Sequence, residues 1–194
     1  MPKKKLPKKV ITYLKKAGVP HDIIEHKTVY TAYDAAMTMG KKVEEIAKSL
    51  VVKADKDYYM VLVPANRNLD LDKVKKNISK LKQKDVKVLK IPGEKIMQNA
   101  LNLKDETVSA FGQLHKLPVI IDKGLTKAKK AVFSSGGVNH SVEMRVKDYL
   151  NLEGAQEGSF SVIKKVKKIK KQENKKTTKP KNKKVTKQKN KKTK

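Results

Sequence analysis

The 194-residue chain contains no cysteine. Cysteine would supply a thiol nucleophile, disulfides and thiolate ligands for zinc, so its absence excludes all three. The four histidines (His21, His26, His115 and His140) are scattered, without the spacing that metal ligands show. We therefore expect neither a metal site nor another cofactor.

Aromatic residues and long apolar runs are also scarce. Phe, Trp and Tyr make up 5% of the chain and Trp is absent, which supplies a base-stacking surface poorly. No apolar run approaches the ~20 residues of a membrane span. The basic N-terminus lacks the apolar stretch of a secretory signal. We expect a cytoplasmic protein with no membrane partner.

Acidic residues are few: 19 Asp and Glu stand against 48 Lys and Arg, for a formal charge of +29. Such a charge points to a polyanionic partner. Residues 161–194 hold 17 lysines and one acidic residue, a charge of +16, and the first 160 residues carry the remaining +13. We expect a basic arm (1–9), a folded domain (10–160) and a lysine-rich tail (161–194) that is disordered because it is highly charged and poorly hydrophobic. Such a tail also suits a nuclear-import signal or a ribosome-binding arm.

Hydrophobic spacing predicts helices and strands interspersed along the domain. Thr31 and Asp70 are expected helix N-caps, Gly93 opens a further helix, and Asp148 is expected to cap the last one. The predicted helices cover residues 10–17, 32–39 and 71–81; the predicted strands cover 21–26, 49–53, 58–63, 86–89, 118–122, 131–134 and 141–146. This mixture predicts a single α+β domain.

Lys48 is unusual because it interrupts an apolar run, residues 46–52, that reads as a buried strand. Alternate residues of a strand share a face, so the lysine should lie beside Ile46, Leu50 and Val52. An ammonium on an apolar face loses hydration unless a partner or a substrate compensates. Two interpretations stay open: the lysine reaches water along its own stem, or it belongs to a functional site.

Six segments, taken in order, resemble the YbaK/prolyl-tRNA-synthetase-associated domain family. They are residues 31–36, 46–52, 69–74, 109–112, 117–122 and 134–140, within a region of about 10–152. The resemblance implies a mixed, mostly antiparallel sheet flanked by helices. It also implies a trans-acting aminoacyl-tRNA deacylase that hydrolyses the ester of a mischarged tRNA, as in prolyl-tRNA editing. The partners that it implies are tRNA and, as a second candidate, an aminoacyl-tRNA synthetase.

The same resemblance assigns roles to particular residues. Lys48 corresponds to the family's pocket lysine, and Gly112 to a glycine whose backbone borders the scissile ester. Ser135 belongs with them to the expected catalytic set. The expected substrate-binding residues are Thr31, Gly136, Gly137, Asn139 and His140. The chain departs from some members of the family, because Ile24 stands where they have a tyrosine and no aspartate lies near Ser141.

An aminoacyl ester is already activated, so its hydrolysis needs positioning, a water or hydroxyl, and support for oxyanion charge. Free backbone N–H groups at Gly112 or Gly136–Gly137 would suit the last task. Purely structural roles stay open for the same residues. The glycines could serve only as turn residues, Ser135 could bond the backbone of its own turn, and His140 could lie at the rim of a pocket. Asp122 reads as a cap or turn residue rather than a base. We find no nucleophile–base–orienter set, so the resemblance suggests substrate-assisted hydrolysis. The alternative function is a non-catalytic RNA-binding or synthetase-associated module that retains the fold.

Overall fold

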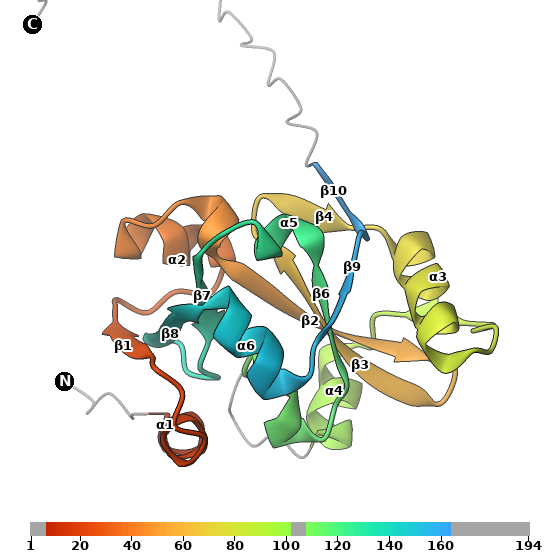
Figure 1. Cartoon of the computed structure of the whole chain (residues 1–194), viewed down its shortest axis with the longest axis horizontal. Coiled ribbons are helices and arrows are strands. Elements are labelled where there is room, and N and C mark those ends of the chain that lie inside the picture. The colour runs from red at the N-terminus through yellow and green to blue at the C-terminus, as the bar shows by residue number, and fades with distance from the viewer. Residues whose placement is uncertain (1–6, 102–107, 164–194) are drawn as a thin grey trace, which may run out of the picture. The chain divides into compact units, whose positions relative to one another are not determined.

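The computed structural model describes residues 7–101 and 108–163 (Figure 1). These residues belong to a unit formed by residues 1–164, and a second unit, residues 165–194, lies outside the described part. Of the tail predicted to be disordered, residues 164–194 lie outside the described range. The first helix, α1, already includes Lys8 and Lys9, which we had assigned to the basic arm.

The described chain is an α+β unit with three sheets. The five-stranded sheet has the order β5-β2-β3-β6-β9, the three-stranded sheet β1-β8-β7, and a short pair β10-β4 completes the set. Their bounds are β1 Asp22–Glu25, β2 Ala47–Ala54, β3 Asp57–Pro64, β4 Arg67–Leu69, β5 Leu89–Lys90, β6 Val119–Asp122, β7 Lys130–Ser134, β8 His140–Arg145, β9 Gln156–Gly158 and β10 Ser161–Ile163. The pairs β3–β6 and β6–β9 are parallel, while the other strand pairs are antiparallel. The mixed, mostly antiparallel prediction is confirmed.

Helices flank these sheets. They are α1 Lys8–Lys16, α2 Ala32–Met39, α3 Leu71–Lys82, α4 Glu94–Ala100, α5 Lys123–Thr126 and α6 Val146–Glu153, with 3₁₀ turns η1 Val43–Glu45 and η2 Gly112–His115. The predicted starts of α2 and α3 are confirmed, because Thr31 Oγ1 accepts from Asp34 N (3.1 Å) and Asp70 Oδ1 accepts from Lys73 N (3.2 Å). Each bond satisfies one of the amide groups that a helix start leaves without a partner.

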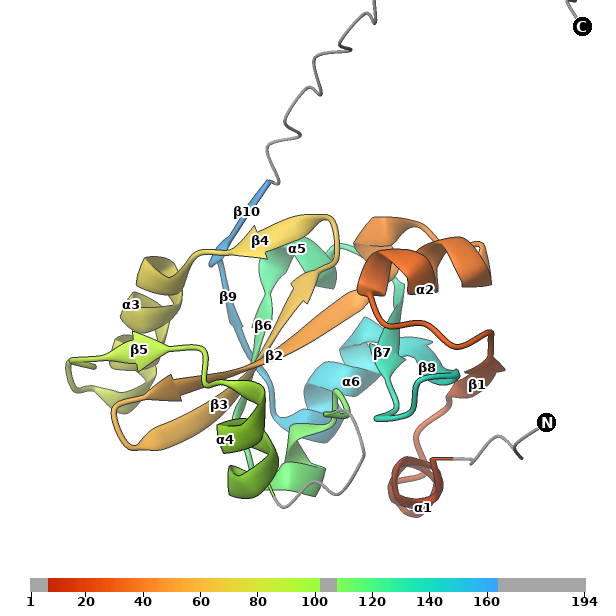
Figure 2. The ribbon, with the colours of Figure 1, turned by 180° about the vertical axis from the view of Figure 1, so that it is seen from behind.

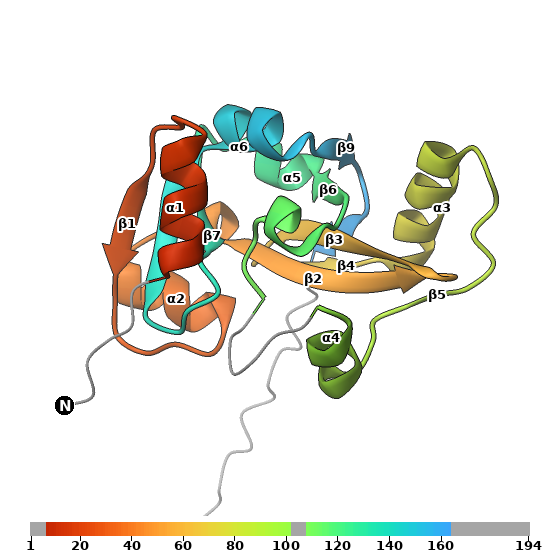
Figure 3. The ribbon, with the colours of Figure 1, turned by 90° about the horizontal axis from the view of Figure 1, so that it is seen from below.

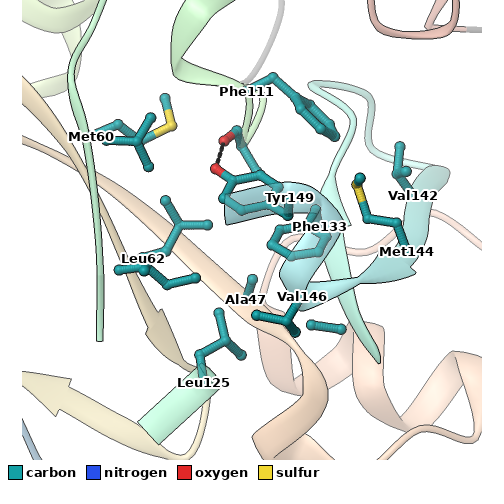
Figure 4. Packing of buried hydrophobic residues seen from close by; sticks show 14 of the residues in the cluster. Ala47, Met60, Leu62, Phe111, Leu125, Phe133, Val142, Met144, Val146 and Tyr149 are labelled. Atoms are coloured by element: carbon teal, nitrogen blue, oxygen red, sulfur yellow. Dashed lines mark hydrogen bonds between the residues drawn. The ribbon is translucent and has the colours of Figure 1, made fainter. Parts of the chain in front are cut away.

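The main core lies between the two larger sheets and their helices. The rings of Phe133 and Tyr149 stack with centroids 4.1 Å apart, and Phe111 packs beside both. Tyr149 is fully buried, and its hydroxyl donates to the carbonyl oxygen of Ala110 (Figure 4). The helix α1 covers the three-stranded sheet with its buried residues Val10 and Leu14 (Figure 3). A second cluster joins α3 to the opposite face of β2 and β3.

Three local predictions are wrong. The expected strand at 86–89 is reduced to Leu89–Lys90, because the N–H groups of Lys87 and Val88 are taken by the carboxylate of Asp55. Asp148 is not the N-cap of α6: the N-cap is Arg145, and Asp148 lies in the first turn, where it binds the Arg145 guanidinium (2.7 and 3.1 Å).

The third correction concerns the end of the folded domain, which we had placed at Phe160. Residues 161–163 form β10 and pair with β4, so they belong to the fold rather than to the tail (Figure 1). The reason lies in Asp122, whose buried carboxylate accepts from Phe160 N (2.8 Å), Ser161 N (2.8 Å) and Ser161 Oγ (2.7 Å).

Candidate functional site

The two larger sheets meet at a parallel bridge between Ile46, just before β2, and Val132 in β7. Both segments leave this bridge in the same direction. Lys48 and Ser134 are each two residues beyond it, about 6–7 Å along their strands. Ser134 in turn accepts from Ala110 N through its carbonyl oxygen (2.8 Å), and its hydroxyl donates to Val108 O (3.3 Å). The fold thus collects three of the matching segments around one junction.

Lys48 lies on the predicted face of β2. Its cross-strand partner is the fully buried Val63, and Val52 on the same face is also fully buried. The side chain is half-buried, and its Nζ donates to the carbonyl oxygen of Arg67 (3.2 Å). Arg67 is one of only two arginines in the chain, and its Nη1 donates to Ser161 Oγ (3.4 Å). The ammonium is therefore held by a backbone dipole at the edge of an apolar layer.

The 135–140 loop, which we define as the connection from β7 to β8 together with the first residue of β8, holds five of the predicted residues in a compact arrangement. Ser135 is buried; its hydroxyl donates to His140 O (2.6 Å) and accepts from Gly137 N (3.3 Å). The Gly136 amide donates to the hydroxyl of Ser134 (3.2 Å), and Gly136 has a φ of 83°, a conformation that glycine adopts without strain. The two glycine amides that we expected to be free are thus engaged by serine hydroxyls within the loop.

The same loop is fastened to the segment that precedes α2. His26 N donates to Asn139 O (3.0 Å) and Val29 N donates to Val138 O (2.9 Å). His140 is buried, and its Nδ1 lies 2.9 Å from Asn139 Oδ1. Thr31, which is exposed, follows directly and caps α2. Thr31 and residues 135–140 are therefore neighbours through the 26–30 segment.

Gly112 lies beside the carboxyl group of Glu153 rather than beside the residues of the 135–140 loop. The neighbouring Gln113 N donates to Glu153 Oε2 (2.9 Å) and Tyr13 OH donates to Glu153 Oε1 (2.9 Å), while the Gly112 amide faces the same carboxyl. Burial raises the pKa of the Glu153 carboxyl, while the two amides and the tyrosine act in the opposite direction. Burial, together with the Glu153 charge, raises the pKa of Tyr13. The Gly112 amide therefore faces an internal carboxyl group.

A cavity of about 560 Å³ borders this carboxyl. Its lining comes from α3, η2, β6, the end of α6 and the start of β9, and includes Gln113, Lys116, Val119, Glu153 and Gln156. It contains none of the residues that we assigned to the site, although Gln113 follows Gly112 directly. Within residues 7–101 and 108–163, no group of three His, Asp or Glu side chains is arranged to hold a metal ion. The helices in these same ranges include none that is long and apolar enough to cross a membrane.

Sequence reasoning missed several residues at the junction. Ser49 Oγ is buried and has no hydrogen-bond partner in the described structure, and only its position in an apolar strand hinted at this. Arg67 carried no local signal. Asp122 behaves as the cap residue that we expected, since it accepts from Gly124 N (2.8 Å) at the start of α5. The hydrogen bonds that Asp122 also accepts from residues 160–161 were not predicted.

The fold and this junction define an α+β module with a lysine at the meeting point of two sheets. The family model of the aminoacyl-tRNA editing domain matches residues 26–152, and the chain belongs to this family. The matched region includes the junction, the 135–140 loop and the Glu153 partners Gly112 and Gln113.

Similar proteins agree with this assignment. A proline–tRNA ligase of Thermosipho melanesiensis is 37% identical over 54 residues, which is 28% of this chain and only 10% of that protein. A solved structure described as a proposed trans-editing enzyme for prolyl-tRNA synthetase has a TM-score of 0.68 and 24% identity, and covers 80% of this chain and 96% of its own. A protein without an assigned function has a TM-score of 0.66 and 19% identity over 79% and 99% of the two chains. At these identities the two structures show a shared fold.

Proposed function

We propose that this protein hydrolyses the ester between an amino acid and the 3′ end of a tRNA, and so removes wrongly attached amino acids in trans. One observation carries the proposal: the editing-domain match includes a lysine held at the junction of the two sheets. The reaction consumes one water and releases a free amino acid and a tRNA with a free 3′ hydroxyl.

Lys48 is the group in this proposal that stabilises negative charge. Its ammonium is positioned by the Arg67 carbonyl, and it lies beside apolar residues that weaken the screening of its charge. A positioned cation is most useful where charge develops, on the carbonyl oxygen of the ester or on the terminal phosphate. Because the Gly136 and Gly137 amides already have serine acceptors, we assign the oxyanion to Lys48 rather than to the loop.

The 135–140 loop takes the role of a wall for the amino-acid side chain. Ser135 donates its hydroxyl proton to a carbonyl oxygen, which is too weak a base to activate a nucleophile. We therefore propose Ser135, Gly136, Gly137, Asn139 and His140 as a rigid boundary of the pocket, and water or a ribose hydroxyl as the nucleophile.

We further propose a proline-accepting tRNA as the substrate. The support is the 54-residue similarity to a proline–tRNA ligase and the fold shared with the proposed trans-editing enzyme. The basic tail, with its charge of +16, supplies affinity for the tRNA backbone that does not depend on sequence. A synthetase remains the second proposed partner.

The test is single-turnover hydrolysis of proline-accepting tRNA charged with a panel of amino acids. We expect Lys48→Ala to lower the rate by about 10²–10³-fold with tRNA affinity retained, the usual effect of removing one oxyanion-stabilising group. Lys53→Ala is the matched control, because Lys53 is another half-buried lysine on β2 and contacts the Tyr58 ring. If Lys48→Ala hydrolyses the ester as fast as the wild type, the role of the lysine is refuted. If the wild type binds tRNA but cleaves no ester of the panel, the non-catalytic alternative is correct.

A further inference from the structure

The exposed aromatic residues of this chain are concentrated at one place. All nine aromatic residues lie in the described structure. The three phenylalanines and Tyr149 are fully buried, Tyr59 is 8% exposed, and Tyr13 and Tyr58 are partly buried. Tyr30 and Tyr33, in contrast, are 87% and 58% exposed. Two tyrosines three residues apart thus present their rings to solvent.

Both tyrosines sit on fixed backbone. Tyr33 is the second residue of α2, whose start is held by the bonds between Thr31 and Asp34. Tyr30 directly follows Val29, whose amide is bonded to Val138 in the proposed pocket wall. Figure 2 shows α2 close to β7 and to the start of β2, and a buried cluster that includes Ala36, Ile46 and Val132 joins these elements. The helix that carries Tyr33 therefore packs against the junction that carries Lys48.

The chemistry of this surface fits an unpaired nucleic-acid strand. Every base has a flat face that stacks on an aromatic ring without regard to its identity. Lys27, which is exposed, lies three residues before Tyr30, and the first 160 residues carry a formal charge of +13. The acidic residue on the first turn of α2, Asp34, is engaged by the Thr31 hydroxyl. A polyanion that offers bare bases is the partner that this combination favours.

We propose that Tyr30 and Tyr33 stack on the unpaired bases at the 3′ end of tRNA and so deliver the esterified terminus to the 135–140 loop. This inference rests on the proposed function, because the ester is carried by the single-stranded end. It adds a second contact to the phosphate contacts of the lysines: the tail holds the backbone of the RNA, and the tyrosines hold the bases next to the ester.

The experiment measures binding of an uncharged RNA hairpin with a four-nucleotide unpaired 3′ end, and of the same hairpin with a blunt end. Tyr30→Ala and Tyr33→Ala should each weaken binding of the overhang RNA on the order of 10-fold or more, the usual effect of losing one stacked base. Binding of the blunt RNA should stay unchanged. Tyr30→Phe and Tyr33→Phe keep the ring and should bind as the wild type. Because both side chains are exposed, the variants should keep the wild-type Tm.

Met37→Ala is the matched control, since Met37 is 67% exposed and one turn after Tyr33 on the same face of α2. Equal loss in Met37→Ala, or no loss in the alanine variants of the tyrosines, would overturn the stacking proposal. So would variants that bind the overhang RNA normally but no longer bind a prolyl-tRNA synthetase, because the surface would then dock protein. The readout needs no hydrolysis. A wild type that binds the overhang through its tyrosines but cleaves no ester therefore refutes the proposed function and leaves this inference standing.

Discussion

Gly112 offers a test that separates packing from chemistry. It is buried, and a methyl group added to its Cα would meet Val119 Cγ2 closer than two carbons can approach, and Leu117 O at 2.6 Å. Leu117 leads into β6 and Val119 begins this buried strand, so neither neighbour yields easily. Gly112→Ala therefore forces the 3₁₀ turn η2 away from β6.

Overpacking of this kind costs about 1–3 kcal/mol of unfolding free energy. For a protein of this length each kcal/mol lowers Tm by roughly 2–4 °C, so we expect a fall of several degrees. Calorimetry of the purified variant measures this fall. Gly93→Ala is the control, because a methyl at Gly93 has no atom within 4 Å and the residue has ordinary extended backbone.

The second readout is the single-turnover rate of the folded variant. The Gly112 amide faces the Glu153 carboxyl, which accepts from the adjacent Gln113 N, so we predict that ester hydrolysis falls only as far as the structure is disturbed. A variant with the wild-type Tm would refute the packing argument. A variant with a lowered Tm that hydrolyses no ester at a temperature where it is folded would restore Gly112 to the catalytic set.

Two further predictions follow from the buried carboxyl groups. Removing residues 164–194 should flatten the salt dependence of tRNA binding and leave Tm unchanged. Removing residues 161–194 should also lower Tm, because Asp122 then loses two of its hydrogen-bond donors, each worth about 1.5–3 kcal/mol. Equal Tm values for the two truncations would contradict the role of β10. The pKa of the Glu153 carboxyl is raised in the folded state, so folding favours its neutral form. Below the ordinary carboxyl pKa this group is neutral in both states and its burial does not lower the unfolding free energy. As pH rises through the folded pKa, the unfolding free energy falls. Urea unfolding between about pH 4 and pH 8 should show this fall in the wild type and not in Glu153→Gln, and parallel pH profiles would refute it.

The helix starts were predictable because their signals are local. Thr31 and Asp70 bond an amide three residues away, so the pattern needs no knowledge of the rest of the chain. Asp148 carried a similar signal and misled us, because β8 runs directly into α6 and places Arg145 at the N-cap. The strand β6 was predictable for a different reason: a strand buried on both faces reads as a continuous apolar run.

The rest depended on contacts between distant residues. The strand β10 exists because Asp122 holds the chain at residues 160–161, across about forty residues of sequence, and because β4 offers a free edge. Residues 161–163, which stand next to a run of lysines, carry no local signal that they pair with β4. The Gly112 amide was likewise assigned to substrate because the carboxyl that it faces, on Glu153, lies some forty residues further along the chain.

Aromatic composition bears on the proposed recognition of nucleic acid only through the rings that the fold exposes. An aromatic content of 5% predicts a poor stacking surface, but it counts buried and exposed rings alike. Stacking depends only on rings that solvent reaches, and the fold leaves Tyr30 and Tyr33 outside while it buries the phenylalanines. A protein with many aromatic residues in its core can therefore offer less stacking surface than this one. What decides is where the scarce rings lie, and here they lie on the segment bonded to the 135–140 loop.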